Sequence, residues 1–211
     1  MATLDELKAV VIDMEVEKAV ELTQKALDED KKAEEILNQA LVPAMDIVGD
    51  QYDRGDKFVP EMLLAANAMK SAMVLLRPLL VESGVKMKGK IVIGTVEGDL
   101  HDIGQNLVSM MLEGAGFEVV NLGSETPSDE FVQAVKEHSP DIVGMSAMLT
   151  TTMLHMPEVI DALKEAGLRD KVKMMIGGAP LTQDYADEIG ADGYSPDAST
   201  ATKLANKLMQ S

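Results

Sequence analysis

The sequence contains no cysteine, which excludes disulfide bonds, thiolate nucleophiles, zinc–cysteine sites and iron–sulfur clusters together. Any metal site must therefore use His, Asp or Glu. Aromatic residues are also rare at 3%, whereas there are 16 methionines. An apolar interior of this kind is adaptable, which suits a broad apolar ligand but equally suits an ordinary helical core. The length of 211 residues, 46% of them hydrophobic, is enough for one or two modest globular domains.

Basic side chains are scarce, with 19 Lys and Arg against 36 Asp and Glu, so the net charge is −17. A field of this sign repels phosphate backbones and anionic lipid headgroups, and we expect no nucleic-acid partner and no membrane partner. Residues 1–18 lack the basic start and apolar run of a signal peptide, and we expect no stretch that approaches a membrane span. These features predict a cytoplasmic protein.

The first part of the chain has a helical hydrophobic period, which predicts a helical bundle of four or five helices over residues 1–83. Pro43 is a candidate breaker, Pro60 can open a helix over 61–76, and Pro78 should end or kink that helix. Residues 84–89 are expected to be an exposed linker.

From residue 90 onward, short β-branched runs alternate with helical segments. Strands are predicted at 90–96, 117–123, 141–147, 171–178 and 191–195, and helices at 102–115, 127–138, 153–166, 181–189 and 197–209. Buried strands separated by helices indicate an α/β domain over 90–211, a flavodoxin-like, doubly wound, five-stranded parallel sheet. Such sheets bind ligands beyond the carboxyl ends of their strands.

Polar and small residues follow three of these strands. His101 comes after the first strand, with Asp99 placed to accept from its ring and Asp102 as a rival partner that could instead serve the start of a helix. A lone histidine there is more often an ordinary loop residue. Residues 146–152 carry four hydroxyls, which could bind a ligand or cap a helix, and 177–178 are two glycines, which could admit a broad ligand or form a turn.

The spacing of these residues resembles the cobalamin-binding domain of B12-dependent methionine synthase, base-off mutases and corrinoid methyl-carrier proteins, with its pattern D-x-H-x-x-G, S-x-L and G-G. Here Asp99–Gly104 is followed by 41 residues, then by Ser146-Ala147-Met148, then by 28 residues and Gly177-Gly178. Met148 replaces the usual Leu, which is an isosteric change. Residues 41–82 also resemble the helical cap that precedes this domain, and the whole chain is most similar to the corrinoid proteins of anaerobic methyltransferase systems.

The resemblance implies that a base-off cobalamin, or a related corrinoid, binds with His101 as the lower axial ligand of cobalt. Asp99 and Thr152 would complete the axial-ligand relay, Ser146 and Thr150 would contact the displaced base, and the two glycines would take the nucleotide tail. The cofactor-binding positions implied in the sheet domain are Gly98, Asp99, Leu100, His101, Asp102, Ile103, Gly104, Ser146, Met148, Thr150, Thr152, Gly177, Gly178, Tyr194, Asp197 and Ala198. Phe58, Val59 and Met62 of the cap would shield the upper face of the corrin.

The implied function is methyl transfer, in which Co(I) accepts a methyl group from a donor on a substrate-specific methyltransferase. Methyl-Co(III) would pass it to coenzyme M or a tetrahydrofolate-type acceptor on a second methyltransferase, and a reductive activator would restore Co(I). An amine or betaine is the favoured donor class, and the protein would not be catalytic alone.

Three alternatives have weaker support in the residues. A B12-responsive regulator would need a DNA-binding module, for which there is no basic helix. A B12-dependent mutase subunit would resemble residues 90–211 without a cap. A nucleotide-binding flavodoxin-like domain would need a phosphate loop, and neither G-x-x-x-x-G-K-[ST] nor G-x-G-x-x-G occurs.

Overall fold

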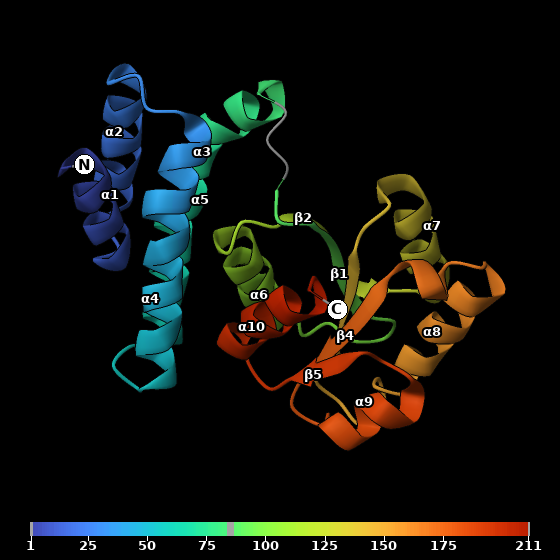
Figure 1. The fold of residues 1–211 in the computed structure, drawn as a ribbon. Coiled ribbons are helices and arrows are strands. Elements are labelled where there is room, and N and C mark those ends of the chain that lie inside the picture. Colours follow the sequence, from blue (N-terminus) through green and yellow to red (C-terminus); the bar gives the residue numbers. More distant parts are fainter. Residues whose placement is uncertain (1, 84–86, 211) are drawn as a thin grey trace. The chain divides into compact units, whose positions relative to one another are not determined.

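The computed structural model describes residues 2–83 and 87–210, and part of the predicted linker, residues 84–86, lies outside them (Figure 1). The described chain divides into two compact units. One contains the residues up to Met87 together with Glu113–Gly116, and the other contains Lys88–Leu112 and the residues from Phe117 onward.

The helical unit is built from four helical segments. They are α1 (Ala2–Ile12), α2 (Val16–Asp28), a continuous segment of α3 (Ala33–Ile36), the π-helical turn η1 (Leu37–Leu41) and α4 (Val42–Asp53), and finally α5 (Val59–Glu82). Apolar residues at helical spacing are buried in this unit, among them Leu7, Val11, Ala19, Ile36, Leu41, Val48, Met69 and Leu76. The predicted all-helical character of this half is confirmed.

Pro43 does not break a helix, contrary to the sequence prediction. It occupies the first turn of α4, directly after η1, and the helical segment runs through it from Ala33 to Asp53. Proline has no backbone N–H to donate, and a widened π turn immediately before it removes the need for a regular bond there. The helical pattern therefore continues where a breaker was expected.

The last helix of the unit, α5, begins near Pro60 as predicted but is longer than expected. The Phe58 amide donates to the Glu61 carboxylate at 2.8 Å, which satisfies one free N–H at the start of the helix. Pro78 lies inside α5, which runs on to Glu82, so this proline does not end the helix. Pro78 has no N–H to donate, and the packed turns on either side of it can keep the helix intact across this one missing hydrogen bond.

By length and composition α5 is also a candidate membrane span, over Val59–Leu80 with a mean hydropathy of 1.3. The expectation that no stretch approaches a membrane span is therefore wrong for this helix. The helix is this apolar because it contributes buried side chains to the core, among them Met62, Ala65, Ala68 and Leu76. The core helix of a soluble protein meets the same criterion, so one such helix is weak support for a membrane location.

The second unit is the predicted parallel sheet. Its strands are β1 (Lys90–Val96), β2 (Glu118–Thr126), β3 (Ile142–Ser146), β4 (Lys173–Gly177) and β5 (Gly193–Ser195). All four strand pairs are parallel, in the order β2-β1-β3-β4-β5. The order reverses between β1 and β3, and this is the switch point at which doubly wound sheets bind ligands. The predicted fold class is confirmed.

Helices cover both faces of this sheet (Figure 1). They are α6 (Ile103–Gly114), α7 (Ser128–His138), α8 (His155–Glu165), α9 (Gln183–Ile189) and α10 (Ala198–Leu208). Side chains of α7, α8 and α9 form one apolar core with Val92, Val96, Val143, Met145 and Ile176 of the sheet. Helices α6 and α10 lie on the other face. Predicted boundaries differ most at β2, which runs to Thr126, and at β4, which is preceded by a 3-10 turn at Arg169–Lys171.

Candidate functional site

The loop between β1 and α6 carries Asp99 and His101, which form a close pair. The Nδ1 atom of His101 lies 2.8 Å from Oδ1 of Asp99, and the His101 backbone amide donates to the same oxygen at 3.0 Å. The Asp99 side chain is fully buried, whereas the His101 side chain is 51% exposed. Since an ionised carboxylate can only accept, the Nδ1 atom carries the proton and Nε2 keeps a lone pair that could bind a metal.

The other oxygen of Asp99 is held by the loop that follows β3. Oδ2 accepts hydrogen bonds from the Met148 amide at 2.7 Å and from the Thr152 hydroxyl at 2.5 Å. The structure thus places the predicted relay residues Asp99, His101 and Thr152 in contact. It also shows that Met148 takes part through its backbone amide, which the sequence pattern did not indicate.

These hydrogen bonds set the charge of the buried carboxylate. Burial raises the pKa of Asp99, but the bonds donated by Thr152 and Met148, together with those of His101, outweigh it and hold the pKa well below its usual range. Asp99 is therefore a carboxylate at neutral pH. A buried negative charge beside Nδ1 fixes the tautomer of the imidazole and raises the basicity of Nε2.

Asp102, the rival partner, stands at the start of a helix, and it is Asp99 that pairs with the imidazole. Asp102 directly precedes α6, and its backbone carbonyl accepts from the Asn106 amide at 2.7 Å, as the residue before a helix does. Gly98 has a φ of +75°, which permits the turn that brings Asp99 under the loop. At Gly104, a side chain would meet open space.

Large apolar side chains lie exposed around the imidazole. Leu100 is 67% exposed and Ile103 is 76% exposed, and Met148 and Leu149 of the β3 loop are also exposed. Leu100 and Ile103 lie in the same loop as His101, and the hydrogen bond from the Met148 amide to Asp99 brings the β3 loop to it, so exposed apolar side chains accompany a nitrogen that could bind a metal. A flat, largely apolar cofactor that brings its own metal, such as a corrinoid, fits this combination.

Ser146, at the end of β3, lies beside a residue that the sequence pattern did not single out. Its Oγ is 2.8 Å from Oγ1 of Thr95, a fully buried threonine at the end of β1. The only sequence signal for Thr95 is a hydroxyl near the end of an otherwise apolar strand. Thr150, in contrast, is exposed in the β3 loop.

Gly177, at the end of β4, and Gly178, directly after it, differ in how strictly the fold requires a glycine. A Cβ at Gly178 would lie 1.8 Å from the Ala147 carbonyl oxygen, and the residue has a φ of +135°, so only glycine fits. A Cβ at Gly177 would lie 3.2 Å from the Ser195 carbonyl oxygen. The close approach of the β3 and β4 loops therefore already requires Gly178, and contact of either glycine with a nucleotide tail stays a prediction.

The remaining predicted contacts fall in two places. Asp197 caps α10 by accepting from the Thr200 amide at 2.8 Å, Ala198 is buried beside it, and Tyr194 is partly buried in β5. In the helical unit, Phe58 is 67% exposed and Val59 is partly exposed, whereas Met62 is fully buried. The Met62 side chain thus has no exposed surface to offer a cofactor in this structure. Contacts of all these residues with a cofactor stay predictions.

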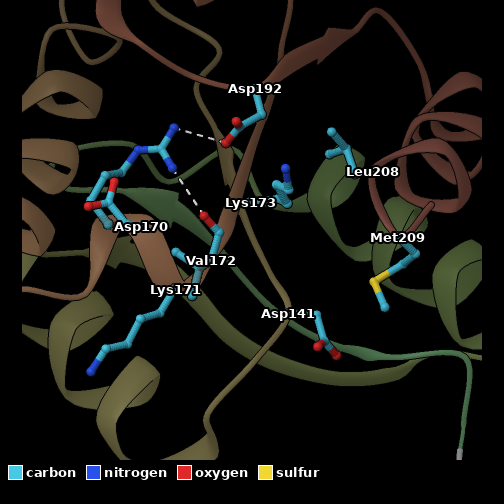
Figure 2. A pocket seen from close by; sticks show the side chains of 9 residues that line it. Asp141, Asp170, Lys171, Val172, Lys173, Asp192, Leu208 and Met209 are labelled. Atoms are coloured by element: carbon cyan, nitrogen blue, oxygen red, sulfur yellow. Dashed lines mark hydrogen bonds and ion pairs between the residues drawn. The ribbon is translucent and has the colours of Figure 1, made fainter. Parts of the chain in front are cut away.

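A pocket of about 580 Å³ lies at the opposite, amino-terminal edge of the sheet (Figure 2). Its polar groups are largely used by the protein itself. Arg169 donates to Asp192 at 2.9 Å and to the Val172 carbonyl at 3.0 Å, and Asp141 accepts from the Lys90 amide at 2.8 Å. This pocket is separate from the residues that the sequence pattern brings together.

The fold and this site define a cobalamin-binding protein with a helical unit and a Rossmann-like domain, and comparison with known proteins gives the same result. Two family models described as B12 binding domains match residues 89–203 and 3–77. The chain belongs to the family of B12-binding corrinoid proteins.

Known relatives and solved structures are similar to this chain along almost its full length. The chain is 43% identical to a corrinoid protein of Desulfitobacterium hafniense over 99% of this chain and 98% of the relative. It is 45% identical to dimethylamine corrinoid protein 3 of Methanosarcina acetivorans, with coverage of 98% and 96%. Among solved structures, the methanol:cobalamin methyltransferase complex MtaBC of Methanosarcina barkeri matches with a TM-score of 0.87 and 31% identity, covering 99% of this chain and 80% of that one.

Proposed function

We propose that this protein binds a corrinoid and carries a methyl group between partner methyltransferases. The observation that carries the proposal is the buried Asp99 carboxylate paired with the half-exposed imidazole of His101, on an apolar surface at the switch point of the sheet. Full-length similarity to dimethylamine and trimethylamine corrinoid proteins supports the same function.

Each residue of the site has a definite task in this proposal. The bound corrinoid supplies the cobalt that accepts and releases the methyl group. His101 would offer Nε2 to the cobalt, and Asp99 would hold the proton on Nδ1 and stabilise positive charge on the ring. Thr152 and the Met148 amide keep Asp99 ionised. The exposed side chains of Leu100, Ile103, Met148 and Leu149 would lie against the apolar corrin and exclude water from it.

In the helical unit, the exposed side chains of Phe58 and Val59 are proposed to shield the upper face until a methyltransferase docks. Domain boundaries at 1–83, 84–89 and 90–211, and a cytoplasmic location, complete the proposal. A second methyltransferase, which takes the methyl group to its final acceptor, and a reductive activator are the further partners.

A methylated amine is the favoured donor because several relatives are dimethylamine or trimethylamine corrinoid proteins. The test is to mix the reduced, corrinoid-loaded protein with a dimethylamine- or trimethylamine-specific methyltransferase and its amine, and to follow the visible spectrum. Methylation with neither enzyme would contradict the donor class while leaving corrinoid binding intact.

The central proposal is tested by the visible spectrum of the protein reconstituted with hydroxocobalamin, beside the His101→Ala variant. We expect stoichiometric binding and a spectrum that changes when His101 is replaced. Absence of binding to the wild type would refute corrinoid carriage. Binding with identical spectra in both proteins would refute the axial role of His101 alone.

A further inference from the structure

Four polar side chains form a cluster between α6 and β2, apart from the residues of the axial-ligand relay. They are Gln105, Asn106 and Ser109 of α6 and Asn121 of β2. Gln105 and Ser109 are buried, whereas Asn121 lies at the surface. Burying polar side chains costs free energy unless their hydrogen bonds are made inside the protein. The hydrogen bonds of this cluster therefore show what it holds together.

The amide group of Asn121 has one orientation that its neighbours allow. Its Oδ1 atom accepts hydrogen bonds from the Gly123 backbone amide at 2.8 Å and from Nε2 of Gln105 at 2.9 Å. Its Nδ2 atom donates to Oδ1 of Asn106 at 2.9 Å. Because a backbone N–H can only donate, the Gly123 amide fixes which side of the Asn121 amide is the oxygen. One oxygen of Asn121 thus joins strand β2 to helix α6.

The side chain of Gln105 is fixed in the same way, and one of its atoms is left unpaired. Its Nε2 atom donates to Asn121 Oδ1 and, over a longer 3.4 Å, to the Ile93 carbonyl of β1. Turning the amide round would place its oxygen against these two acceptors. Its Oε1 atom is buried and has no hydrogen-bond partner within the part of the chain that the structure describes. An unpaired buried acceptor is unfavourable, so the bonds donated by Nε2 are what this side chain contributes.

Strand β2 departs from regular pairing directly after Asn121. Asn121 and Gly123 pair with neighbouring residues of β1 although Leu122 lies between them, so the strand has a bulge there. Beyond the bulge, Glu125 has a φ of +52°, in the left-handed region that a residue with a side chain rarely adopts. The Glu125 backbone amide donates to the Asp99 carbonyl at 3.1 Å. The bulged end of β2 is thereby bonded to the backbone of Asp99.

These hydrogen bonds hold the loop of residues 97–102 at two points. The Glu125 amide binds the loop at Asp99, and Gln105 fixes the first turn of α6, which begins two residues after His101. Asn121 is common to both, since its oxygen accepts from Gln105 and from a backbone amide of the bulge. Gln105, Asn121 and Glu125 are here called the β2 brace.

We infer that the β2 brace holds the imidazole of His101 in place for cobalt, and that Asn121 is the positioning residue on which the brace depends. The inference rests on the proposed function, because the brace matters to His101 in this way only if the ring binds the metal. The half-exposed ring is oriented by Asp99 of the same loop, so a loop that shifts carries both residues with it. The β3 loop holds the Asp99 carboxylate, and the brace holds the backbone on either side of the imidazole before the cofactor binds.

The test is the midpoint potential of the Co(II)/Co(I) couple, measured by reductive titration of the cobalamin-loaded protein. Co(II) keeps an axial imidazole and Co(I) binds none, so a weaker bond from His101 raises this potential by about 59 mV for each tenfold loss of ligand affinity. Asn121→Leu and Gln105→Leu each remove the bond between α6 and β2. Asn121→Asp keeps an oxygen that can accept both bonds. Asn106→Ala is the matched control, because it removes only the partner of Asn121 Nδ2.

Each substitution is measured both in the wild type and in the His101→Ala variant. An effect that passes through the imidazole disappears when His101 is absent, whereas a direct effect on the cofactor remains. Subtracting the second shift from the first therefore isolates the contribution of the brace to the axial bond. The subtraction also removes the direct effect of the charge that Asn121→Asp adds.

After subtraction, we expect Asn121→Leu and Gln105→Leu to lower the ligand affinity about three- to tenfold, as loss of one hydrogen bond predicts, which raises the potential by about 30–60 mV. Asn121→Asp and Asn106→Ala should change the affinity by less than about twofold. Shifts of Asn121→Leu and Gln105→Leu that are equal with and without His101, zero included, would overturn the inference while corrinoid binding stands. An Asn106→Ala shift as large as that of Asn121→Leu would overturn it too.

Failure of the proposed function gives different results. If His101→Ala has the same potential as the wild type, the axial role of His101 is refuted, and the inference with it. If the wild type binds no cobalamin, corrinoid carriage itself is refuted.

Discussion

The Oδ1 atom of Asp99 accepts hydrogen bonds from both the ring and the backbone amide of His101, so the carboxylate fixes the position and the tautomer of the imidazole at once. The carboxylate is fully buried and the ring is half exposed. The imidazole proposed as the metal ligand faces solvent, and it is oriented by a charge that solvent does not reach.

Replacement of Asp99 by asparagine should destabilise the protein without a cofactor. Both oxygens of Asp99 accept hydrogen bonds, and an amide can offer an acceptor at only one of the two positions. We expect the free energy of unfolding in urea to fall by about 2 kcal/mol or more, since buried donors lose their partner. Asp102→Asn, on the same loop, is the control and should change it by less than about 0.5 kcal/mol. Equal stability of the two variants would contradict the role given to Asp99.

The lowered pKa of Asp99 also predicts how stability depends on pH. A carboxylate with a folded-state pKa below its unfolded value of 3.8 stabilises the protein fully above that value, and the contribution is lost as the pH falls further. Below about pH 3.8, the unfolding free energy of the wild type should fall by about 1.4 kcal/mol per pH unit more steeply than that of Asp99→Asn. Urea unfolding at several acidic pH values measures both slopes, and parallel slopes would contradict the prediction.

Thr152 should tolerate serine but not valine. Its hydroxyl donates to Asp99 at 2.5 Å, and a hydrogen bond to a buried charge contributes about 1.5–3 kcal/mol. Thr152→Val keeps the shape and removes the donor, so the unfolding free energy should fall by that amount. Thr152→Ser keeps the donor and should lose less than about 1 kcal/mol. Thermal melts of both variants decide the matter, and a serine variant as unstable as the valine variant would show that the methyl group matters more.

The two glycines flanking the site should respond to alanine in opposite ways. At Gly178 a Cβ would collide with the Ala147 carbonyl, whereas at Gly104, in the first turn of α6, it would meet open space. Gly178→Ala should cost about 2–3 kcal/mol through overpacking and a disfavoured φ, and Gly104→Ala should be neutral or slightly stabilising. Circular dichroism melts compare the two, and a well-folded Gly178→Ala protein would mean that the β3 and β4 loops can separate freely.

Much of this organisation was predictable from the sequence because it is local. Buried β-branched runs and helical spacing located the five strands, and the Asp99–His101 pair follows from two residues in one loop. What the sequence could not give is contact across strands. The pairing of Thr95 with Ser146 depends on the register between β1 and β3, and the use of the Met148 amide depends on the path of a loop.

The differences in the helical unit have a related cause. Pro43 is a breaker by local rules and Pro78 was expected to end or kink its helix, but both helices continue through these residues. The choice between Asp99 and Asp102 as the partner of His101 is likewise decided by the fold, which buries one carboxylate under the β3 loop and leaves the other at the start of α6.

The exposed apolar residues beside His101 should contribute to cofactor affinity without contributing to folding. Leu100 and Ile103 have most of their side chains in solvent, so Leu100→Ser and Ile103→Ser should leave the melting temperature unchanged. Covering such a side chain with a corrin contributes on the order of 1 kcal/mol, so each variant should bind hydroxocobalamin about fivefold more weakly. Val74→Ser, on the similarly exposed Val74 of α5, is the control and should bind like the wild type. If Leu100→Ser and Ile103→Ser also bind like the wild type, the corrin does not rest on this surface, and the fit between cofactor and site would have to be sought elsewhere on the same edge of the sheet.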